Sequence, residues 1–241
     1  MASTSIPLAP RRILRFAQRV KSAISNDVID RVIRQRLTYL DRAALAWIRS
    51  EVLRIEAEGI PGSLIETGCA LGGSSIVIAA SKAPARSLNI YDVFGMIPSP
   101  SDKDGADVHR RYEVIASGAS KGIGTDEYYG YRSNLLAEVR QYFTRNGFEP
   151  EQNSIQFVAG LYEDTLSPVA PLAFAHIDCD WYESVSVCLE RIWPCLSKGG
   201  SLILDDYFCY SGCRAAAWDY FRNRMDEFTF VNGPRLLIRK V

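Results

Sequence analysis

Apolar residues recur at intervals of three and four through the first quarter of the chain. Between residues 11 and 58 this spacing gathers them on one side of a helix, so the segment is predicted to be helical. Gly59, Pro61 and Gly62 follow directly and end the pattern. The apolar residues that carry the spacing are Ile13, Phe16, Val20, Leu40, Ala44, Trp47 and Ile48.

From residue 63 onward, short apolar runs alternate with amphipathic stretches. Strands are predicted at 63–67, 87–93, 154–160, 171–178 and 201–206, and helices at 73–82, 182–196 and 214–225. The runs FTFVN and RLLIRKV, separated by Gly233 and Pro234, predict a closing hairpin. Continuous apolar strands alternating with helices indicate an α/β fold with a mostly parallel sheet covered on both faces. The hairpin adds an antiparallel edge.

Residues 94–130 interrupt this alternation. The segment is rich in Gly, Pro, Ser and Asp and shows no strand pattern. Loops this long are uncommon inside a compact domain and usually cover a binding site. We therefore expect a lid, with a disordered insertion as the alternative. The chain divides into a helical N-terminal extension, 1–58, and a domain, 59–241, that carries the insertion.

The composition is that of an ordinary globular protein, with 47% hydrophobic and 23% charged residues. Lys+Arg and Asp+Glu both total 28, so the overall charge gives no reason to expect a nucleic acid partner. The charge is uneven, because residues 1–36 carry eight Lys or Arg against two Asp. A basic helical arm of this kind either docks on a membrane surface or on a second subunit, or is a solvated helix.

No apolar run approaches the ~20 residues that a bilayer-spanning helix needs, and the first residues show no apolar stretch of the secretory type. The six cysteines are scattered without a CxxC pair, and the chain has only two histidines. A structural zinc site would therefore have to consist almost entirely of thiolate ligands. These features predict a cytoplasmic protein with reduced thiols.

The first predicted strand ends in the run ETGCALGGSS, residues 66–75. Glycine lets the backbone turn tightly and approach a ligand closely. Three residues separate Gly68 from Gly72, so the run is not the GxGxxG turn of dinucleotide-binding dehydrogenases. Glu66, before the turn, suits a cationic ligand such as the amino acid part of S-adenosylmethionine, contacted directly or through water. The alternative is an ordinary strand-to-helix turn.

The second predicted strand ends at Asp92, 24 residues after Gly68. An acidic residue at about this distance from a glycine turn commonly accepts hydrogen bonds from ribose hydroxyls. Asp92 is therefore a candidate ribose ligand. The alternative is a helix cap, which is also a frequent role of aspartate after a strand.

Two pairs of acidic residues follow the fourth and fifth strands: Asp178 with Asp180, and Asp205 with Asp206. Ligands of open parallel sheets bind at the carboxyl ends of the strands, and neighbouring strands lie only ~4.8 Å apart. The four carboxylates should therefore converge and repel one another unless a cation neutralises them. Mg²⁺, a hard cation with oxygen ligands, is the expected occupant. The alternative is a capping Asp180 and a solvated Asp206 without an ion.

The run Asp178-Cys179-Asp180 also has the DxD form with which glycosyltransferases hold a metal bound to a nucleotide diphosphate. That chemistry needs neither the second acidic pair nor the glycine turn. A metal-dependent glycosyltransferase is therefore the second hypothesis, and a non-catalytic S-adenosylmethionine-binding protein is the third.

Four stretches of the sequence together resemble the macrocin O-methyltransferase (TylF-like) family. They are ETGCALGGSS, DVFGMIPSPSDKDGADVHRRYE, IDCDWYESV and LDDY, within roughly residues 60–225. The resemblance implies a Rossmann-like methyltransferase fold with a seven-stranded sheet, and an enzyme that uses S-adenosylmethionine and Mg²⁺. Members of the family methylate sugar hydroxyls on natural products or glycans. The basic N-terminal helices resemble parts that help such enzymes form homodimers or higher homo-oligomers.

The resemblance also implies roles for particular residues. Asp178, Asp205 and Asp206 match the metal-binding acids of the family. His176 is a departure, because several members carry an arginine there, and this difference bears on the substrate contact. The residues implied in cofactor binding are Glu66, Thr67, Gly68, Ala70, Ser74, Asp92, Asp178 and, near the adenine, Tyr162 and Glu163.

Methyl transfer from a sulfonium requires an activated oxygen nucleophile. The expected acceptor is a small molecule or glycan with vicinal hydroxyls that bind the metal, which lowers the pKa of one of them. The candidate bases are Asp178 and Asp180, followed by His109 in the predicted lid. The aromatic cluster at 128–131 either stacks on a sugar face or anchors the loop. His176 itself is expected to be a hydrogen-bonded structural residue.

Overall fold

The computed structural model describes residues 28–241, and the first 27 residues lie outside the described part of the chain. Residues 28–34 are helical, and helix α2 (Arg42–Glu58) follows. Asp41 begins α2 by accepting a 2.8 Å hydrogen bond from the Ala44 N–H, and Gly59 ends it with a left-handed φ of 65°. The predicted helices are therefore confirmed from residue 28 onward, whereas most of the basic arm falls outside the described residues.

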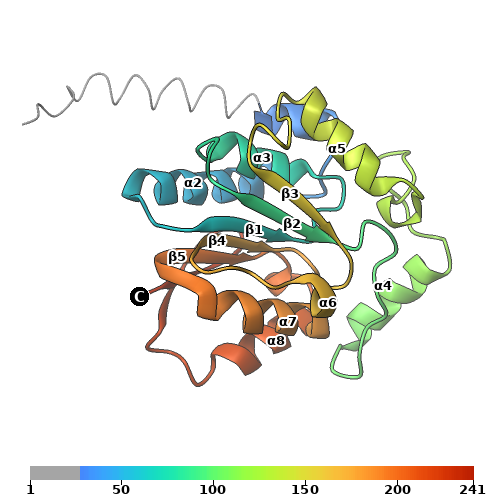
Figure 1. The fold of residues 1–241 in the computed structure, drawn as a ribbon. Coiled ribbons are helices and arrows are strands. Elements are labelled where there is room, and N and C mark those ends of the chain that lie inside the picture. The colour runs from blue at the N-terminus through green and yellow to red at the C-terminus, as the bar shows by residue number, and fades with distance from the viewer. Residues whose placement is uncertain (1–27) are drawn as a thin grey trace, which may run out of the picture.

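A sheet of seven strands forms the centre of the molecule (Figure 1), in the order β3-β2-β1-β4-β5-β7-β6. The first five strands in this order pair in parallel, and β7 pairs antiparallel with both β5 and β6. The predicted parallel sheet with an antiparallel closing hairpin is confirmed. The strands are β1 (Ser63–Thr67), β2 (Leu88–Asp92), β3 (Ile155–Ala159), β4 (Leu172–Ile177), β5 (Leu196–Leu204), β6 (Phe228–Val231) and β7 (Leu236–Lys240).

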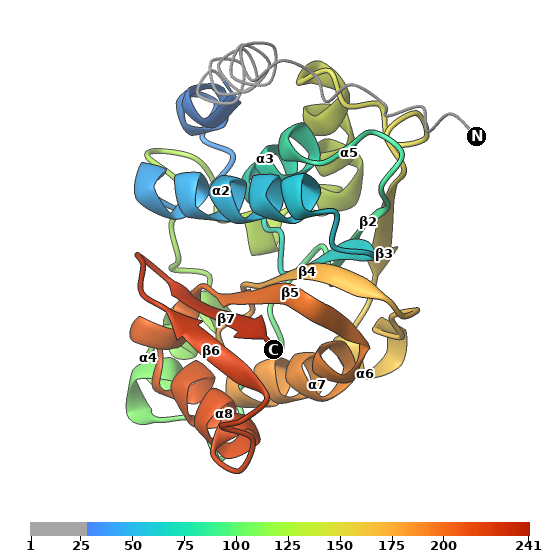
Figure 2. The ribbon, with the colours of Figure 1, turned by 90° about the vertical axis from the view of Figure 1, so that its left-hand side faces the viewer.

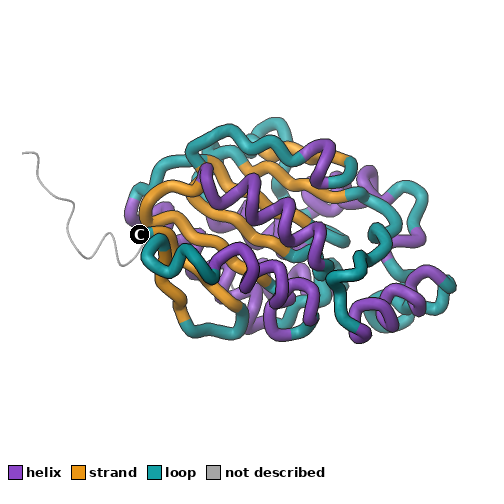
Figure 3. The backbone as a smooth tube through the Cα atoms, turned by 90° about the horizontal axis from the view of Figure 1, so that it is seen from below, coloured by secondary structure: helices purple, strands orange, loops and turns teal. Residues whose placement is uncertain are grey.

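Helices cover both faces of the sheet, with α2, α3 and α5 on one side and α6, α7 and α8 on the other (Figure 2). A hydrophobic core lies on each side of the sheet, and strand residues point into one or the other. Phe174 packs in the core with the first group of helices and Ala175 in the core with the second. Figure 3 shows the second group crossing in front of the strands. The remaining helices are α3 (Gly73–Ser81), α5 (Leu135–Arg145), α6 (Tyr162–Thr165), α7 (Tyr182–Ile192) and α8 (Ser211–Phe221). None of the helices within residues 28–241 is both long and apolar enough to cross a bilayer.

The boundaries of α7, β5 and α8 differ from the prediction by three residues or more, and the differences at α7 and β5 have one local cause. Helix α7 ends at Ile192 instead of 196, because Pro194 lies in the short 3-10 turn η2 (Trp193–Cys195) and cannot continue an α-helix. Strand β5 consequently begins at Leu196, five residues before the predicted start. Helix α8 begins three residues earlier than predicted, at Ser211.

The insertion at 94–130 contains helix α4 (Ala106–Ala116) and leads into the 3-10 turn η1 (Tyr129–Tyr131). Neither α4 nor α5 was predicted. Val108 and Ile115 of α4 are buried with Tyr128 and Trp181 in a small core of their own. The alternative of a disordered insertion is therefore wrong. In Figure 1 α4 lies apart from the sheet, next to α8, which it contacts.

Candidate active site

The turn between β1 and α3 is held by Asp92, the last residue of β2. Its Oδ2 accepts hydrogen bonds from the N–H groups of Cys69 (2.7 Å) and Ala70 (3.2 Å), and its Oδ1 accepts one from Phe94 (2.7 Å). Burial nevertheless raises the pKa of Asp92 above its ordinary value. Asp92 thus fixes the shape of the turn, a role that the sequence did not indicate.

Gly68 brings this turn into direct contact with the loop that follows β4. It has a φ of 83°, and a Cβ at this position would lie 1.8 Å from the carbonyl oxygen of Asp178. Only glycine fits both the conformation and the approach. The backbone that follows β1 therefore lies against the residue that begins the acidic motif.

Glu66 and Thr67 lie beneath the turn instead of on a cavity surface. Glu66 is fully buried, accepts a hydrogen bond from the Ser75 hydroxyl of α3, and lies 2.7 Å from Nδ1 of His176. Thr67 is also fully buried, and its hydroxyl oxygen accepts from the Cys188 thiol of α7 at 3.4 Å. Successive strand residues face opposite sides of a sheet, and helices cover both sides here. The expectation that these two side chains contact the cofactor directly is therefore corrected.

The predicted acidic residues meet at neighbouring strand ends. The Asp178 N–H donates to the Thr67 carbonyl at 2.9 Å and the Asp205 N–H to the Ile177 carbonyl at 3.0 Å, so each continues the pairing of its strand. One carboxylate oxygen from each of Asp178, Asp205 and Asp206 lies within 4.8 Å of the others. Burial, and then the charges of the other two, raises the pKa of Asp178 well above its ordinary value. This excess of negative charge suits a divalent cation.

Asp205 differs from its neighbours because Arg235 and His176 face it. Arg235 Nε donates to its Oδ1 at 2.8 Å. Nε2 of the fully buried His176 lies 3.7 Å from the same oxygen, too far for a hydrogen bond. Burial opposes the charge on Asp205, but His176 and Arg235 outweigh it and lower the pKa of Asp205.

His176 links β1 to the acidic cluster from within the sheet. Burial opposes a charged imidazole, yet the carboxylates of Asp205 and Glu66 raise the pKa of His176 to about 10. The imidazole ring therefore lies between the carboxylates of Glu66 and Asp205. It lines neither cavity described below, which agrees with a structural residue and not with a substrate contact.

Asp180 has an unusual backbone for a residue other than glycine. Its φ is 60°, in the left-handed region, and its N–H donates to Asp206 Oδ2 at 3.3 Å. Burial raises the pKa of Asp180 to about 6. Strained residues of this kind gather at functional sites when the surrounding structure holds them in place.

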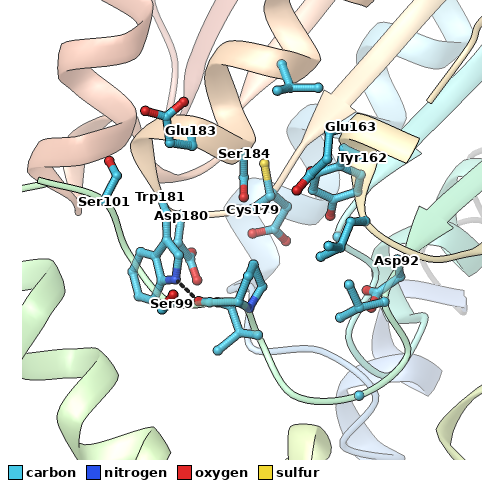
Figure 4. Close-up of a pocket in the computed structure, with 18 of the residues that line it drawn as sticks. Asp92, Ser99, Ser101, Tyr162, Glu163, Cys179, Asp180, Trp181, Glu183 and Ser184 are labelled. Carbon is cyan, nitrogen blue, oxygen red and sulfur yellow. Dashed lines mark hydrogen bonds between the residues drawn. The ribbon is translucent and has the colours of Figure 1, made fainter. Parts of the chain in front are cut away.

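Two adjoining cavities open at the carboxyl ends of the parallel strands. The first measures about 440 Å³ and the second, which contains the acidic cluster, about 300 Å³. Figure 4 shows Asp92, Tyr162, Glu163 and Asp180 around the first. The residues that line both, and so form a shared wall, are Gly68, Asp92, Tyr129, Asp178 and Asp180. Of the other predicted residues, Tyr162 and Glu163 line the first cavity, and Ala70, Ser74, Asp205 and Asp206 line the second.

The insertion supplies walls to both cavities. Its first part, with Ile97 and Pro98, borders the first cavity, and the indole of Trp181 donates to the Pro98 carbonyl at 3.0 Å (dashed line in Figure 4). Farther along, Asp107 accepts a 2.9 Å hydrogen bond from the Ser211 N–H of α8. The insertion is thus tied to residues at the start of both α7 and α8.

His109, the third candidate base, lies on α4 but lines neither cavity. Arg111 does line the second cavity, and its guanidinium lies 5.7 Å from the ring centre of Tyr128. Val108, Arg111 and Ile115 share one side of the helix, whereas His109 lies off this stripe. The spacing of Arg111 from Val108 and Ile115 in the sequence would have placed it on the buried side of this helix.

The tyrosines of the aromatic cluster at 128–131 were predicted either to stack on a sugar or to anchor the loop. Tyr131 anchors the loop, because its hydroxyl donates to the Ile115 carbonyl at 2.6 Å and accepts from the Ser120 N–H at 3.1 Å. Tyr128 and Tyr129 line the second cavity, with ring centres 4.5 Å apart. Tyr128 is itself buried in the small core with α4, so its ring also helps to hold the insertion in place.

The second cavity has other lining residues that the sequence did not indicate, among them Tyr39, Tyr210 and Arg235. These three come from the segment before α2, the start of α8 and the hairpin before β7. No motif in the sequence marks them, since only the folded sheet brings these distant segments to one edge.

The strand order, the glycine turn after β1 and the acidic residue that ends β2 define a Rossmann-like methyltransferase fold. The chain superposes on the structure of the O-methyltransferase NovP with a TM-score of 0.71 and 24% sequence identity. That match covers 85% of this chain and 82% of the other, and it supports the fold.

The chain belongs to the macrocin-O-methyltransferase (TylF) family, whose sequence model matches residues 17–228. It is 36% identical to the 8-demethyl-8-(2,3-dimethoxy-alpha-L-rhamnosyl)-tetracenomycin-C 4'-O-methyltransferase of Streptomyces olivaceus, over 68% of this chain and 59% of the relative. It is 30% identical to the mycinamicin III 3''-O-methyltransferase of Micromonospora griseorubida, over 68% of this chain and 61% of that relative. The chain thus spans less than two thirds of the length of either relative, and the resemblance noted from the sequence is confirmed.

Proposed function

We propose that this protein transfers the methyl group of S-adenosylmethionine to a hydroxyl of a sugar or a glycosylated natural product, with a divalent metal ion at the acidic cluster. The observation that carries the proposal is the position of that cluster, where two cavities meet beside the glycine turn. Membership of the family supports methyl transfer. A relative whose name specifies a rhamnosyl compound supports a sugar acceptor.

The first cavity is the proposed donor site. Gly68 offers a close approach to its backbone, and Asp92 sits at the second strand end, where a ribose is expected. Tyr162 and Glu163 border the part of the cavity proposed for the adenine. Bound there, S-adenosylmethionine supplies an electrophilic methyl group.

Asp178, Asp205 and Asp206 are the proposed metal ligands. They offer oxygen atoms alone, which favours Mg²⁺ over softer metals. Burial is the first cause of the raised pKa of Asp178, and repulsion by Asp205 and Asp206, which a bound cation would relieve, is the second. Held by these three aspartates, Mg²⁺ would supply a Lewis acid that lowers the pKa of a bound acceptor hydroxyl.

The second cavity is the proposed acceptor site, and Asp180 is the proposed base. Tyr128, Tyr129 and Arg111 line this cavity, and aromatic rings and guanidinium donors are groups that sugars commonly contact. Asp180 lies in the shared wall, and its carboxylate takes the proton from the acceptor hydroxyl. Asp178 is the second candidate for this step. The insertion over both cavities excludes water from them.

The test is methylation of a panel of glycosides with vicinal hydroxyls, followed by mass spectrometry. We expect products heavier by one methyl group, loss of activity with EDTA, and recovery with added Mg²⁺. Full methylation activity in EDTA would show that the reaction needs no divalent metal ion, and would contradict this part of the proposal. Calorimetric titration separates the rival functions: binding of UDP without S-adenosylhomocysteine identifies a glycosyltransferase. Binding of S-adenosylhomocysteine without turnover of any glycoside, and without metal dependence, identifies a non-catalytic binding protein.

The expected homodimer or higher homo-oligomer also stays a prediction. Light scattering coupled to size-exclusion chromatography measures it directly, and a monomer at all concentrations contradicts it.

A further inference from the structure

The positively charged side chain of Arg235 forms an ion pair with Asp205, one of the proposed metal ligands. Arg235 lies between β6 and β7, beyond residue 228, where the match to the family ends. Its Nε donates to Asp205 Oδ1 at 2.8 Å, with side-chain exposures of 18% and 7%. The ion pair is therefore largely shielded from water, and so it is stronger than an exposed pair.

The hairpin holds this arginine in place through its own packing. A Cβ on Gly233 would lie 2.4 Å from two ring carbons of Trp47, so the tip of the hairpin sits directly against α2. Arg235 Nη1 also donates to the carbonyl of Pro234 at 3.1 Å. The contact with Asp205 is therefore built into the fold and is not a chance meeting of two surface side chains.

The same carboxylate group serves the ion pair and the acidic cluster. Oδ1 of Asp205 faces Arg235, and also His176 at 3.7 Å, and one carboxylate oxygen of Asp205 completes the cluster with Asp178 and Asp206. A metal ion held by Asp205 would then share this one carboxylate group with the guanidinium. Two cations on one carboxylate repel each other, and partial burial weakens the screening between them.

We propose that Arg235 is an internal counter-ion that competes with the divalent cation for Asp205 and thereby weakens metal binding at the site. The inference rests on the proposed metal site. A guanidinium stays charged at every working pH, so the competition is permanent. His176 faces the same oxygen from within the sheet at 3.7 Å, and this contact stays when Arg235 is replaced.

The test is a titration of Mn²⁺ into the full chain at pH 8, without donor or acceptor, with free Mn²⁺ followed by electron paramagnetic resonance. Arg235→Gln removes the charge and retains hydrogen-bonding groups, and we expect it to bind Mn²⁺ roughly tenfold more tightly than the wild type. Arg235→Lys keeps the charge and is expected to bind like the wild type. Arg235→Met is a second neutral variant, with the same expected gain, and is used if Arg235→Gln does not fold.

Arg239→Gln is the matched control. Arg239 lies on β7 and pairs with Glu51 at 3.2 Å, and Glu51 keeps a second partner in Arg54 at 2.8 Å. This variant removes an equal charge away from the cluster, so its Mn²⁺ affinity is expected to match the wild type.

Unchanged or weaker Mn²⁺ binding by a folded Arg235→Gln or Arg235→Met variant overturns the inference and leaves the metal site standing. Failure of the metal site has a different signature. In that case Asp178→Asn and Asp205→Asn bind Mn²⁺ as the wild type does, or no variant binds it at all, and the role of Arg235 is lost with the site. Circular dichroism and thermal unfolding establish that each variant is folded.

Discussion

The carboxylate of Asp104 accepts a 2.8 Å hydrogen bond from the backbone N–H of Tyr182, the first residue of α7. Trp181 precedes this helix and provides no side-chain cap, so the insertion supplies one from 78 residues away. Asp107 serves α8 in the same way through the N–H of Ser211. The predicted lid, residues 94–130, is therefore hydrogen-bonded to the first residues of α7 and α8.

Loss of the first of these caps should destabilise the whole domain. We expect Asp104→Ala to lower the free energy of unfolding by about 1–2 kcal/mol, the usual effect of deleting a capping side chain. Urea unfolding measures the change. Asp102→Ala is the control, because Asp102 is an exposed residue of the same loop. Equal stabilities of the two variants would contradict trans-capping.

The second cap gives a pH dependence with a defined sign. Hydrogen bonds from Ser211 lower the pKa of Asp107 below its ordinary 3.8. A carboxyl group with a lower pKa in the folded state stabilises the protein above the unfolded value, and loses that contribution as the pH falls through the folded value. The stability difference between the wild type and Asp107→Asn should therefore be present at neutral pH and shrink below about pH 3.8. Urea unfolding at several pH values tests this, and a difference independent of pH speaks against it.

Asp205→Asn tests the acidic cluster itself. The substitution removes a proposed metal ligand with little change in shape, so we expect methylation to fall by roughly 100-fold or more while the protein stays folded. Steady-state kinetics with a glycoside acceptor and circular dichroism measure the two properties. Asp164→Asn, at an exposed aspartate of α6, is the control and should keep its activity. Normal turnover by Asp205→Asn would exclude this aspartate as a ligand.

The glycine turn is tested by a pair of alanine substitutions at similar backbone angles. Gly68 and Gly118 have φ values of 83° and 77°, but only Gly68 has backbone atoms in the space of a Cβ. Gly118→Ala should cost about 1 kcal/mol for conformation alone. Gly68→Ala should cost considerably more and abolish binding of S-adenosylhomocysteine, because the loops after β1 and β4 must separate. Thermal unfolding and calorimetry measure both effects, and similar results for the two variants would count against the close approach.

Substitutions at two nearby residues of α4, His109 and Arg111, should have different effects on the kinetic constants. His109→Ala is expected to leave kcat and KM within about twofold of the wild type, because His109 lines neither cavity. Arg111→Ala should raise the KM for the acceptor several-fold, since Arg111 lines the proposed acceptor site. A large loss of kcat in His109→Ala would restore this histidine as a candidate base.

The sequence predicted the features that depend on local pattern and on strand adjacency. Strand β1 has the predicted bounds, since its apolar run is closed by glycine on both sides. Asp178 and Asp205 lie together because consecutive parallel strands with a helical crossover between them pair directly here. Both inferences need only the apolar pattern and the geometry of a parallel sheet.

The features that the sequence did not predict depend on tertiary placement. Glu66 was expected at a ligand surface, but the helix that covers its face of the sheet buries it against His176. Asp104 acts on a helix 78 residues away, and no local motif encodes such a partner. Arg235 reaches Asp205 because β7 lies between β5 and β6, an order that the hairpin pattern alone does not give.

The two cavities share a wall but differ in where their other walls originate. The second cavity is completed by residues 38–40, by α4 with its following tyrosines, and by the hairpin at Arg235, none of which belongs to the parallel strands. Substitutions in these peripheral pieces can reshape one chamber and leave the strand tips of the other intact. If the second cavity holds the acceptor, as proposed, changes in single loops outside the parallel strands can alter the acceptor site without any change at the strand ends.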